Sequence, residues 1–328
     1  MRLATSLVLA ALVIGGAAVG IDRRAAARAA AAEAAYPPEG RLIDVNGRQV
    51  HALTRGEGPD LVLIHGASGN LRDFSLGFMD RLTDRYRVTA FDRPGLGHTD
   101  RVSDAFAHPF ARFGESPSEQ AALLAEAAAQ IGLRDPIILG HSYGGAVAMA
   151  WALDRPDEIA GVVNVAGATM PWPGSLGALY QVNGTGLGGA LVPPVIAAFA
   201  PEPYVDRVIE EIFTPDTAPD GYAEAVGAAL TIRRDSLRAN ARQVNSLYPH
   251  VVAMAARYPA LQVPVEIVHG DADAIVPLAI HSGPLAALLP AANLTVLAGI
   301  GHMPHHAAPE AVVAAIDRVA ARAAAAEE

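Results

Sequence analysis

Short apolar runs alternate with longer helical segments along most of this chain, and this alternation constrains the fold more than any other feature. The runs at residues 61–64 and 137–139 contain only apolar side chains, as in strands that are buried on both faces of a sheet. Predicted strands cover residues 42–45, 49–53, 61–64, 86–91, 137–139, 162–165, 265–268 and 294–297, and predicted helices cover residues 118–131, about 143–153 and 309–325. This order predicts an α/β fold with a mostly parallel sheet and helices on both of its faces.

The stretch from residue 170 to residue 260 breaks the alternation. It begins with Pro171-Trp172-Pro173-Gly174 and continues through segments rich in glycine and proline. We therefore expect residues 36–169 and 261–328 to form the core, and residues 170–260 to be a helical insertion that packs over the sheet.

The N-terminus carries a run of 19 residues without a charged side chain, residues 3–21. As a helix this run would be about 28 Å long, close to the hydrocarbon thickness of a bilayer. A signal peptide is one interpretation, because the alanine-rich residues 25–35 offer A-x-A cleavage patterns. An uncleaved anchor flanked by three arginines is the other. We expect residues 1–35 to be a signal peptide or membrane anchor plus an alanine-rich linker, and the protein to be membrane-anchored or exported to the periplasm or medium.

The composition excludes several classes of protein. The 328 residues carry 24 basic and 34 acidic side chains, a formal net charge of −10, whereas a nucleic-acid-binding protein needs a basic face for the phosphates. Hydrophobic residues make up 52% of the chain and charged residues 18%, which is incompatible with intrinsic disorder. Cysteine is absent, so disulfides, cysteine-ligated zinc and a cysteine nucleophile are excluded.

The segment Gly140-His141-Ser142-Tyr143-Gly144 has the form G-x-S-x-G and lies between a predicted strand and a predicted helix. In that context a sharp turn between the two elements lifts the serine hydroxyl out of the sheet. The glycines allow neighbouring backbone to approach closely, and the N-terminus of the following helix adds partial positive charge. The sequence therefore predicts that Ser142 is a nucleophile.

A serine hydroxyl needs a base, and the base needs a carboxylate that orients it. His302 is the best candidate for the base because it follows the last predicted strand directly. Asp271 and Asp273 are candidates for the carboxylate, because both follow the strand at residues 265–268 and ligands bind at the carboxyl ends of strands in open α/β sheets. Nucleophile, acid and base then follow one another in the order of a known serine triad.

Two further histidines, His305 and His306, lie close to His302, and a cluster of three histidines is one way to ligate a metal. No carboxylate stands near them in the sequence at a matching spacing, and we expect His305 and His306 to be solvated loop residues. We therefore predict neither a metal nor an organic cofactor.

The oxyanion of a tetrahedral intermediate needs two hydrogen-bond donors. One is expected from the backbone N–H of Tyr143, the residue after the nucleophile. The other is expected from the loop after the strand at residues 61–64, which reads HGASG, and we predict the N–H of Ala67.

Together these motifs resemble those of the α/β-hydrolase superfamily, in particular its capped, cofactor-free serine hydrolases. The resemblance extends from about residue 40 to residue 325 and rests on residues 65–66, 92–99, 140–145, 270–277 and 301–302. In that family the acid is the fourth residue of a G-x-x-D element after the penultimate strand, and this position falls on Asp273. The resemblance implies the α/β-hydrolase fold, with the insertion at residues 170–260 as a helical cap.

Departures from other groups of the superfamily narrow the expected reaction. Haloalkane dehalogenases and epoxide hydrolases of this fold use an aspartate nucleophile, whereas this chain has Ser142. We expect cleavage of a carboxylic ester, lactone or thioester of a small to medium apolar substrate through an acyl-enzyme. Two enzymatic alternatives use the same triad: C–C bond hydrolysis and cofactor-free haloperoxidase or perhydrolase chemistry. A non-catalytic, hydrolase-like ligand-binding protein is the alternative from another class.

The insertion is expected to shape the substrate pocket. Met170, Trp172, Leu179 and Tyr180 are candidate lining residues because they directly follow the sheet, and packing within the cap is the alternative role for them. Their apolar character favours an uncharged, hydrophobic acyl or alkyl group. The expected partner is therefore a small apolar ester, with membrane association through residues 3–21, and the sequence leaves the oligomeric state open.

Overall fold

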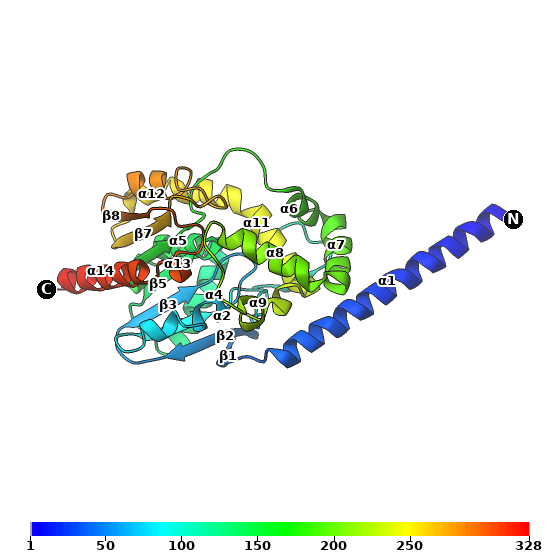
Figure 1. Ribbon diagram of the computed structural model, residues 1–328, viewed down its shortest axis with the longest axis horizontal. Coiled ribbons are helices and arrows are strands. Elements are labelled where there is room, and N and C mark those ends of the chain that lie inside the picture. The colour runs from blue at the N-terminus through cyan, green and yellow to red at the C-terminus, as the bar shows by residue number, and fades with distance from the viewer. Residues whose placement is uncertain (1, 328) are drawn as a thin grey trace.

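An eight-stranded sheet forms the centre of the molecule (Figure 1) in a computed structural model that describes residues 2–327. The strand order is β1-β2-β4-β3-β5-β6-β7-β8, in which β2 pairs antiparallel with β1 and β4 and all other pairs are parallel. The strands are β1 (Arg41–Val45), β2 (Arg48–Arg55), β3 (Asp60–Ile64), β4 (Arg87–Phe91), β5 (Ile137–His141), β6 (Gly161–Val165), β7 (Val265–Gly270) and β8 (Ala292–Leu297). Each predicted strand is present, and the α/β-hydrolase fold is confirmed.

Helices cover both faces of this sheet. The α-helices outside the insertion, whether or not they contact the sheet, are α1 (Arg2–Ala35), α2 (Arg72–Ser75), α3 (Asp104–Ala107), α4 (Pro117–Gln130), α5 (Tyr143–Asp154), α12 (Ser282–Leu288), α13 (Pro304–Ala307) and α14 (Pro309–Glu327). Val62 and Ile64 of β3 pack with α4 and α5 on one face. Leu61 and Leu63 pack with α2 and α14 on the other. Alternate residues of one strand thus enter two separate cores, as the two-residue period of a strand requires.

Residues 170–260 lie between β6 and β7 and contain six α-helices. These are α6 (Ala178–Asn183), α7 (Gly186–Phe199), α8 (Glu202–Phe213), α9 (Tyr222–Ala225), α10 (Ala228–Thr231) and α11 (Arg234–Ala255). In α8, apolar side chains recur at helical spacing, which gives the helix one apolar and one charged side.

The N-terminal segment differs in part from the prediction. Residues 25–35 are not a linker but the last turns of α1, a single helix of 34 residues, because alanine has the highest helix propensity. Ala25 of α1 packs against Ala197 and Ala198 of α7, and the N-terminal end of α1 extends away from the other elements (Figure 1).

Most side chains of residues 3–21 lie outside the described residues, so membrane association through that run stays a prediction. Within the part of the chain that the structure describes, none of the helices combines the length and the hydropathy that a bilayer-spanning segment needs.

Candidate active site

Ser142 occupies a strained turn between β5 and α5, with φ 54° and ψ −118°. This backbone conformation is unfavourable for a residue with a Cβ atom, and neighbouring backbone holds it in place. The Ser142 N–H donates to the carbonyl oxygen of Val165 at 2.9 Å, and its carbonyl oxygen accepts from the N–H of Ala168 at 3.0 Å. A Cβ atom on Gly144 would lie 2.2 Å from the carbonyl oxygen of Ile64. Glycine at position 144 is therefore a steric requirement of the turn.

A continuous chain of hydrogen bonds joins Ser142, His302 and Asp273. His302 Nε2 lies 2.9 Å from Ser142 Oγ, and His302 Nδ1 lies 2.7 Å from Asp273 Oδ2. Because an ionised carboxylate only accepts, Nδ1 carries the proton and Nε2 accepts from the serine hydroxyl. All three side chains are buried. Asp271, the other candidate acid, instead accepts the N–H of Gly299 at 2.7 Å within the neighbouring turn.

Asp273 is held as a carboxylate by four hydrogen-bond donors. Its Oδ1 accepts the backbone N–H groups of Ile275 and Val276, both at 2.9 Å. Its Oδ2 accepts from His302 and, at 3.1 Å, from His269 Nε2. Burial raises the pKa of Asp273, but the hydrogen bonds from His269, His302 and Val276 outweigh burial and bring this pKa well below its ordinary value. The orienting carboxylate therefore stays ionised at neutral pH.

His269 is a partner of Asp273 that no motif in the sequence marks. Its ring is buried at the end of β7, with Nδ1 2.6 Å from Ser282 Oγ and Nε2 2.7 Å from the carbonyl oxygen of Val276. Since a carbonyl oxygen only accepts, Nε2 carries the proton and Nδ1 accepts from the Ser282 hydroxyl. His269 thus fixes the orientation of the Asp273 carboxylate.

A second buried histidine, His141, contacts His302 through a hydrogen bond and through its ring. Its Nε2 donates to the carbonyl oxygen of His302 at 2.9 Å, and the centroids of the two rings lie 4.9 Å apart. Burial, together with the neighbouring His305 and His302, holds the pKa of His141 well below its ordinary value. His141 is therefore neutral at neutral pH.

The two predicted oxyanion donors are the backbone N–H groups of Ala67 and Tyr143. Ala67 lines the cavity next to Ser142, and Tyr143 is the first residue of α5. Among the residues that the structure describes, neither backbone N–H donates a hydrogen bond to another protein group. Both amides are therefore available to a ligand oxygen.

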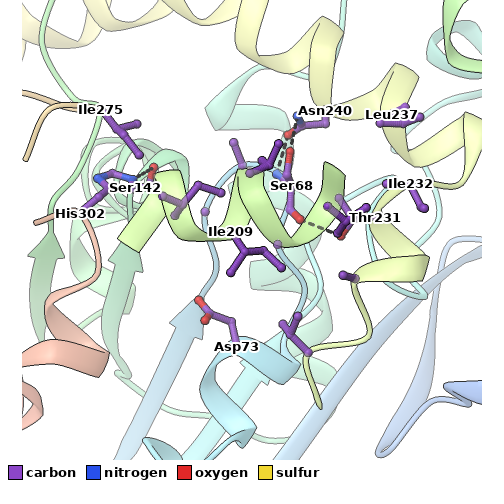
Figure 2. A pocket seen from close by; sticks show the side chains of 18 of the residues that line it. Ser68, Asp73, Ser142, Ile209, Thr231, Ile232, Leu237, Asn240, Ile275 and His302 are labelled. Atoms are coloured by element: carbon purple, nitrogen blue, oxygen red, sulfur yellow. Dashed lines mark hydrogen bonds between the residues drawn. The ribbon is translucent and has the colours of Figure 1, made fainter. Parts of the chain in front are cut away.

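The insertion holds the loop that carries Ala67 (Figure 2). Asn240 of α11 accepts the Ser68 N–H at 2.7 Å and donates to Ser68 Oγ at 2.8 Å. The hydroxyl of Thr231 in α10 donates to the Ser68 carbonyl oxygen at 2.7 Å. Ser68 has a positive φ of 57°, so these bonds from the insertion stabilise an otherwise unfavourable loop conformation.

A cavity of about 400 Å³ lies above Ser142 and His302, between the core and the insertion. Figure 2 shows Ser142 and His302 at one end of it and Ile232 and Leu237 toward the other. Much of its apolar lining comes from the insertion: Leu179, Ile196, Val205, Val208, Ile209, Ile212, Phe213, Val226, Ile232 and Leu237. This volume is large enough for an extended apolar group.

The four predicted pocket residues divide into two pairs. Leu179 and Tyr180 line the cavity, whereas Met170 and Trp172 do not. The backbone N–H of Met170 pairs with His281 Nδ1 at 3.2 Å, which keeps the segment after β6 against the hydrophobic core. The indole of Trp172 packs edge to face against another side chain of the insertion, with ring centroids 5.2 Å apart. The prediction that Met170 and Trp172 line the pocket is therefore wrong.

The prediction of solvated loop histidines at positions 305 and 306 is also wrong. Both side chains are largely buried and pair with Asp73 of α2, His305 Nε2 at 3.0 Å and His306 Nε2 at 2.8 Å. The Tyr222 hydroxyl of α9 donates to the same carboxylate at 2.6 Å. Burial raises the pKa of Asp73, but His305 and His306 outweigh burial and bring it well below its ordinary value.

Asp73, His305 and His306 are also the ligand types of a divalent metal, with one ligand atom from each within 4.8 Å of the others. In this structure the same atoms satisfy one another by hydrogen bonding. The carboxylate comes from a residue 232 positions before His305, which explains why the local sequence shows no matching acid.

The family model described as "Alpha/beta hydrolase family" matches residues 61–315. Haloalkane dehalogenase 2 of Mycobacterium tuberculosis is 33% identical over 141 residues, which are 42% of this chain and 44% of that protein. The chain therefore matches less than half of the length of this curated relative.

Solved structures give matches over most of the chain. An esterase from Exiguobacterium antarcticum is 18% identical, with a TM-score of 0.65, over 85% of this chain and 99% of that one. A structure described as a membrane phospholipase A and bacterial virulence factor is 21% identical, with a TM-score of 0.62, over 97% of this chain and 98% of that one. At these identities the similarity shows the fold alone.

Proposed function

The chain belongs to the alpha/beta hydrolase family, and on that premise we propose that it is a serine hydrolase that cleaves carboxylic esters with an extended apolar group. The observation that carries the proposal is the hydrogen-bonded chain from Ser142 through His302 to Asp273 at one end of an apolar cavity. A ligand-binding protein has no use for a base and a carboxylate aligned on one serine.

Acylation begins when Ser142 Oγ attacks the ester carbonyl. His302 Nε2 takes the hydroxyl proton, and Asp273 stabilises the imidazolium that forms. The N–H groups of Ala67 and Tyr143 hold the negative oxygen of the tetrahedral intermediate. His302 then gives the proton to the leaving alkoxide, which departs as an alcohol and leaves the acyl group on Ser142.

Deacylation repeats these steps with water. His302 Nε2 removes a proton from a water molecule that attacks the acyl carbonyl, and the same two N–H groups hold the second oxyanion. Collapse of this intermediate breaks the bond to Ser142 Oγ, which recovers its proton from His302. The reaction uses only side chains and backbone groups of this chain.

The apolar lining supports an ester whose acyl or alkyl part is hydrophobic. Among the described residues that line the cavity, Asp73 is the one carboxylate. It is already paired with His305, His306 and Tyr222, so it does not require a cationic substrate. The relative named a haloalkane dehalogenase belongs to a group that uses an aspartate nucleophile, and Ser142 at this position favours an ester over an alkyl halide.

Hydrolysis of p-nitrophenyl esters of increasing acyl length by the full chain tests the proposal. We expect turnover with an optimum at a medium or long acyl chain, and a loss of about 10⁴-fold or more in kcat for Ser142→Ala. Ser175→Ala, at an exposed serine of the insertion, is the matched control and keeps full activity. A folded protein without turnover of any ester contradicts the proposal, and C–C substrates and peracid formation are then the reactions to assay.

A further inference from the structure

Helix α7 presents an apolar face that no other described element covers. Its 14 residues include no charged or polar side chain, and Leu187, Leu191, Val195 and Phe199 are 45–68% exposed. These residues are spaced four apart and form one stripe along the helix. A helix that is apolar all round is normally buried in protein or in contact with lipid.

The stripe belongs to a larger apolar surface. Leu179 and Val182 of α6 are about half exposed, and Phe110 and Phe113 are 54% and 70% exposed. Gly186, at the start of α7, lies against the backbone of Phe110. The α6–α7 patch is defined as the exposed side chains of Leu179, Val182, Leu187, Leu191, Val195 and Phe199. Contiguous apolar patches of this kind mark interaction sites.

The cavity reaches this patch. Leu179 and Tyr204 are each 49% exposed, yet both also line the cavity. Ile196 and Ala200, at the end of α7, line the cavity from its inner side. The same helices therefore carry an apolar surface outside and an apolar cavity inside, and Leu179 and Tyr204 belong to both.

Two arginines of α1 lie against the C-terminal end of α7, although the chain as a whole is acidic. Arg24 and Arg28 of α1 donate to the carbonyl oxygens of Ala198 and Ala200 at 2.8 and 3.0 Å, and the Arg24 guanidinium lies 5.3 Å from the Phe199 ring centroid. Aliphatic and aromatic side chains flanked by arginines are the composition of a surface that binds at a lipid headgroup boundary. A protein interface would instead need hydrogen-bonding groups, and the α7 side chains offer none.

We propose that the α6–α7 patch docks on the surface of a phospholipid bilayer, with Arg24 and Arg28 among the headgroups. The substrate is then an acyl ester of a membrane lipid, which enters the cavity from the side of this patch. The choice of substrate rests on the proposed esterase function, whereas the docking surface does not.

Vesicle flotation of the full chain tests the docking, with Ser142→Ala present in each protein so that no lipid is cleaved. Vesicles of phosphatidylcholine alone are compared with vesicles that also contain phosphatidylglycerol. We expect Leu187→Glu/Leu191→Glu to lower the vesicle partition coefficient by about tenfold or more, because both carboxylates would have to enter the acyl boundary. Leu42→Glu, at a 49% exposed leucine of β1, is the matched control and leaves binding unchanged. Binding is stronger to the anionic vesicles.

The active forms of the same variants separate docking from catalysis. We expect Leu187→Glu/Leu191→Glu to hydrolyse a short soluble ester like the parent and to lose activity only on vesicle lipids. Vesicle binding that is unaffected by this double variant overturns the docking surface, whatever the esterase activity. Sedimentation as a dimer that becomes monomeric in the double variant, with vesicle binding unchanged, identifies a contact between copies and also overturns it. Docking without turnover of any ester overturns the function and leaves the surface standing.

Discussion

The two walls of the cavity differ in how they are built. On the core wall, the loops after β3, β5, β7 and β8 supply polar groups that are buried and hydrogen-bonded at fixed positions, such as Asp273 with its four donors. On the insertion wall, helices supply mainly apolar side chains, and residues such as Leu179 and Tyr204 are about half exposed. The candidate reacting groups and the side chains that would contact the apolar part of a substrate therefore lie on separate walls of the cavity.

The physical reason lies in what each wall has to specify. Hydrogen bonds weaken steeply with small errors in distance and angle, so the polar groups need the rigid carboxyl ends of neighbouring parallel strands. Contact with an acyl chain is not directional, and apolar side chains at helical spacing, as on α8, are sufficient. A change in the core wall should therefore alter kcat, and a change in the insertion wall should alter preference among substrates.

The largest expected effect comes from the core wall. Asp273→Asn should lower kcat by about 10⁴-fold, because an amide no longer holds His302 in the tautomer that accepts the Ser142 proton. KM for a p-nitrophenyl ester should change by less than about threefold, because the apolar wall is untouched. Steady-state kinetics with Asp271→Asn as the neighbouring control checks this, and a tenth or more of the parent activity in Asp273→Asn would argue against the triad.

The next effect tests the hydrogen bonds from Asn240 of the insertion to the loop that carries Ala67. Asn240→Ala removes both hydrogen bonds to Ser68, and the neighbouring Ala67 N–H loses its fixed direction. We expect kcat to fall by about 10- to 100-fold with little change in KM. Asn245→Ala, on the same helix but bonded to Tyr180 and Ala241, is the control. If both variants lose activity equally, the loop does not depend on Asn240.

The sequence predicts the core wall better than the insertion wall because each core feature has a local cause. The apolar run at residues 61–64 must be a buried strand, and the glycines around Ser142 are required by a turn in which a Cβ would clash. Asp273 was distinguishable from Asp271 only through the family resemblance, because both follow the same strand. In the structure the difference is the backbone N–H groups of Ile275 and Val276, which a sequence pattern does not display.

Contacts between distant parts of the chain left no local signal. Nothing near His305 in the sequence indicates that it pairs with the carboxylate of Asp73. Nothing in the sequence of β7 indicates that His269 is a hydrogen-bond partner of Asp273. Met170 and Trp172 directly follow the sheet, but sequence position does not say whether a segment turns toward the cavity or back onto the core. These features depend on the tertiary arrangement, which local patterns cannot supply.

The third prediction concerns Asp73. Its carboxylate accepts hydrogen bonds from Tyr222 of the insertion and from His305 and His306 of the core, and so links the two walls. The pKa of Asp73 is lowered in the folded protein, so its carboxylate stabilises the fold at pH values above its unfolded pKa of about 4. That stabilisation is lost as the pH falls toward the folded pKa. The free energy of unfolding of Asp73→Asn should be lower than that of the parent by about 2 kcal/mol at pH 7, and the gap should begin to narrow as the pH falls below about 4.

Urea denaturation between pH 3 and pH 7 measures this gap. Asp104→Asn, at an exposed ion pair with Arg48, is the control and should show no comparable gap. A difference between Asp73→Asn and the parent that is constant with pH would mean that packing, rather than charge, holds the two walls together.

The smallest expected effect comes from the insertion wall, and it tests whether this wall affects substrate preference alone. Ile209 of α8 lines the cavity between the walls (Figure 2), and Ile209→Ala removes apolar contact with a long acyl chain only. We expect kcat/KM to fall about fivefold for long-chain p-nitrophenyl esters, which corresponds to the loss of about 1 kcal/mol of apolar contact, and to stay unchanged for the acetate. Ile209→Trp fills the same space and should move the optimum toward shorter chains. Val252→Ala, at an exposed residue of α11 away from the cavity, should alter neither. An equal loss of kcat/KM on short and long esters would show that the insertion wall affects the reaction itself. The assignment of substrate preference alone to this wall would then be wrong.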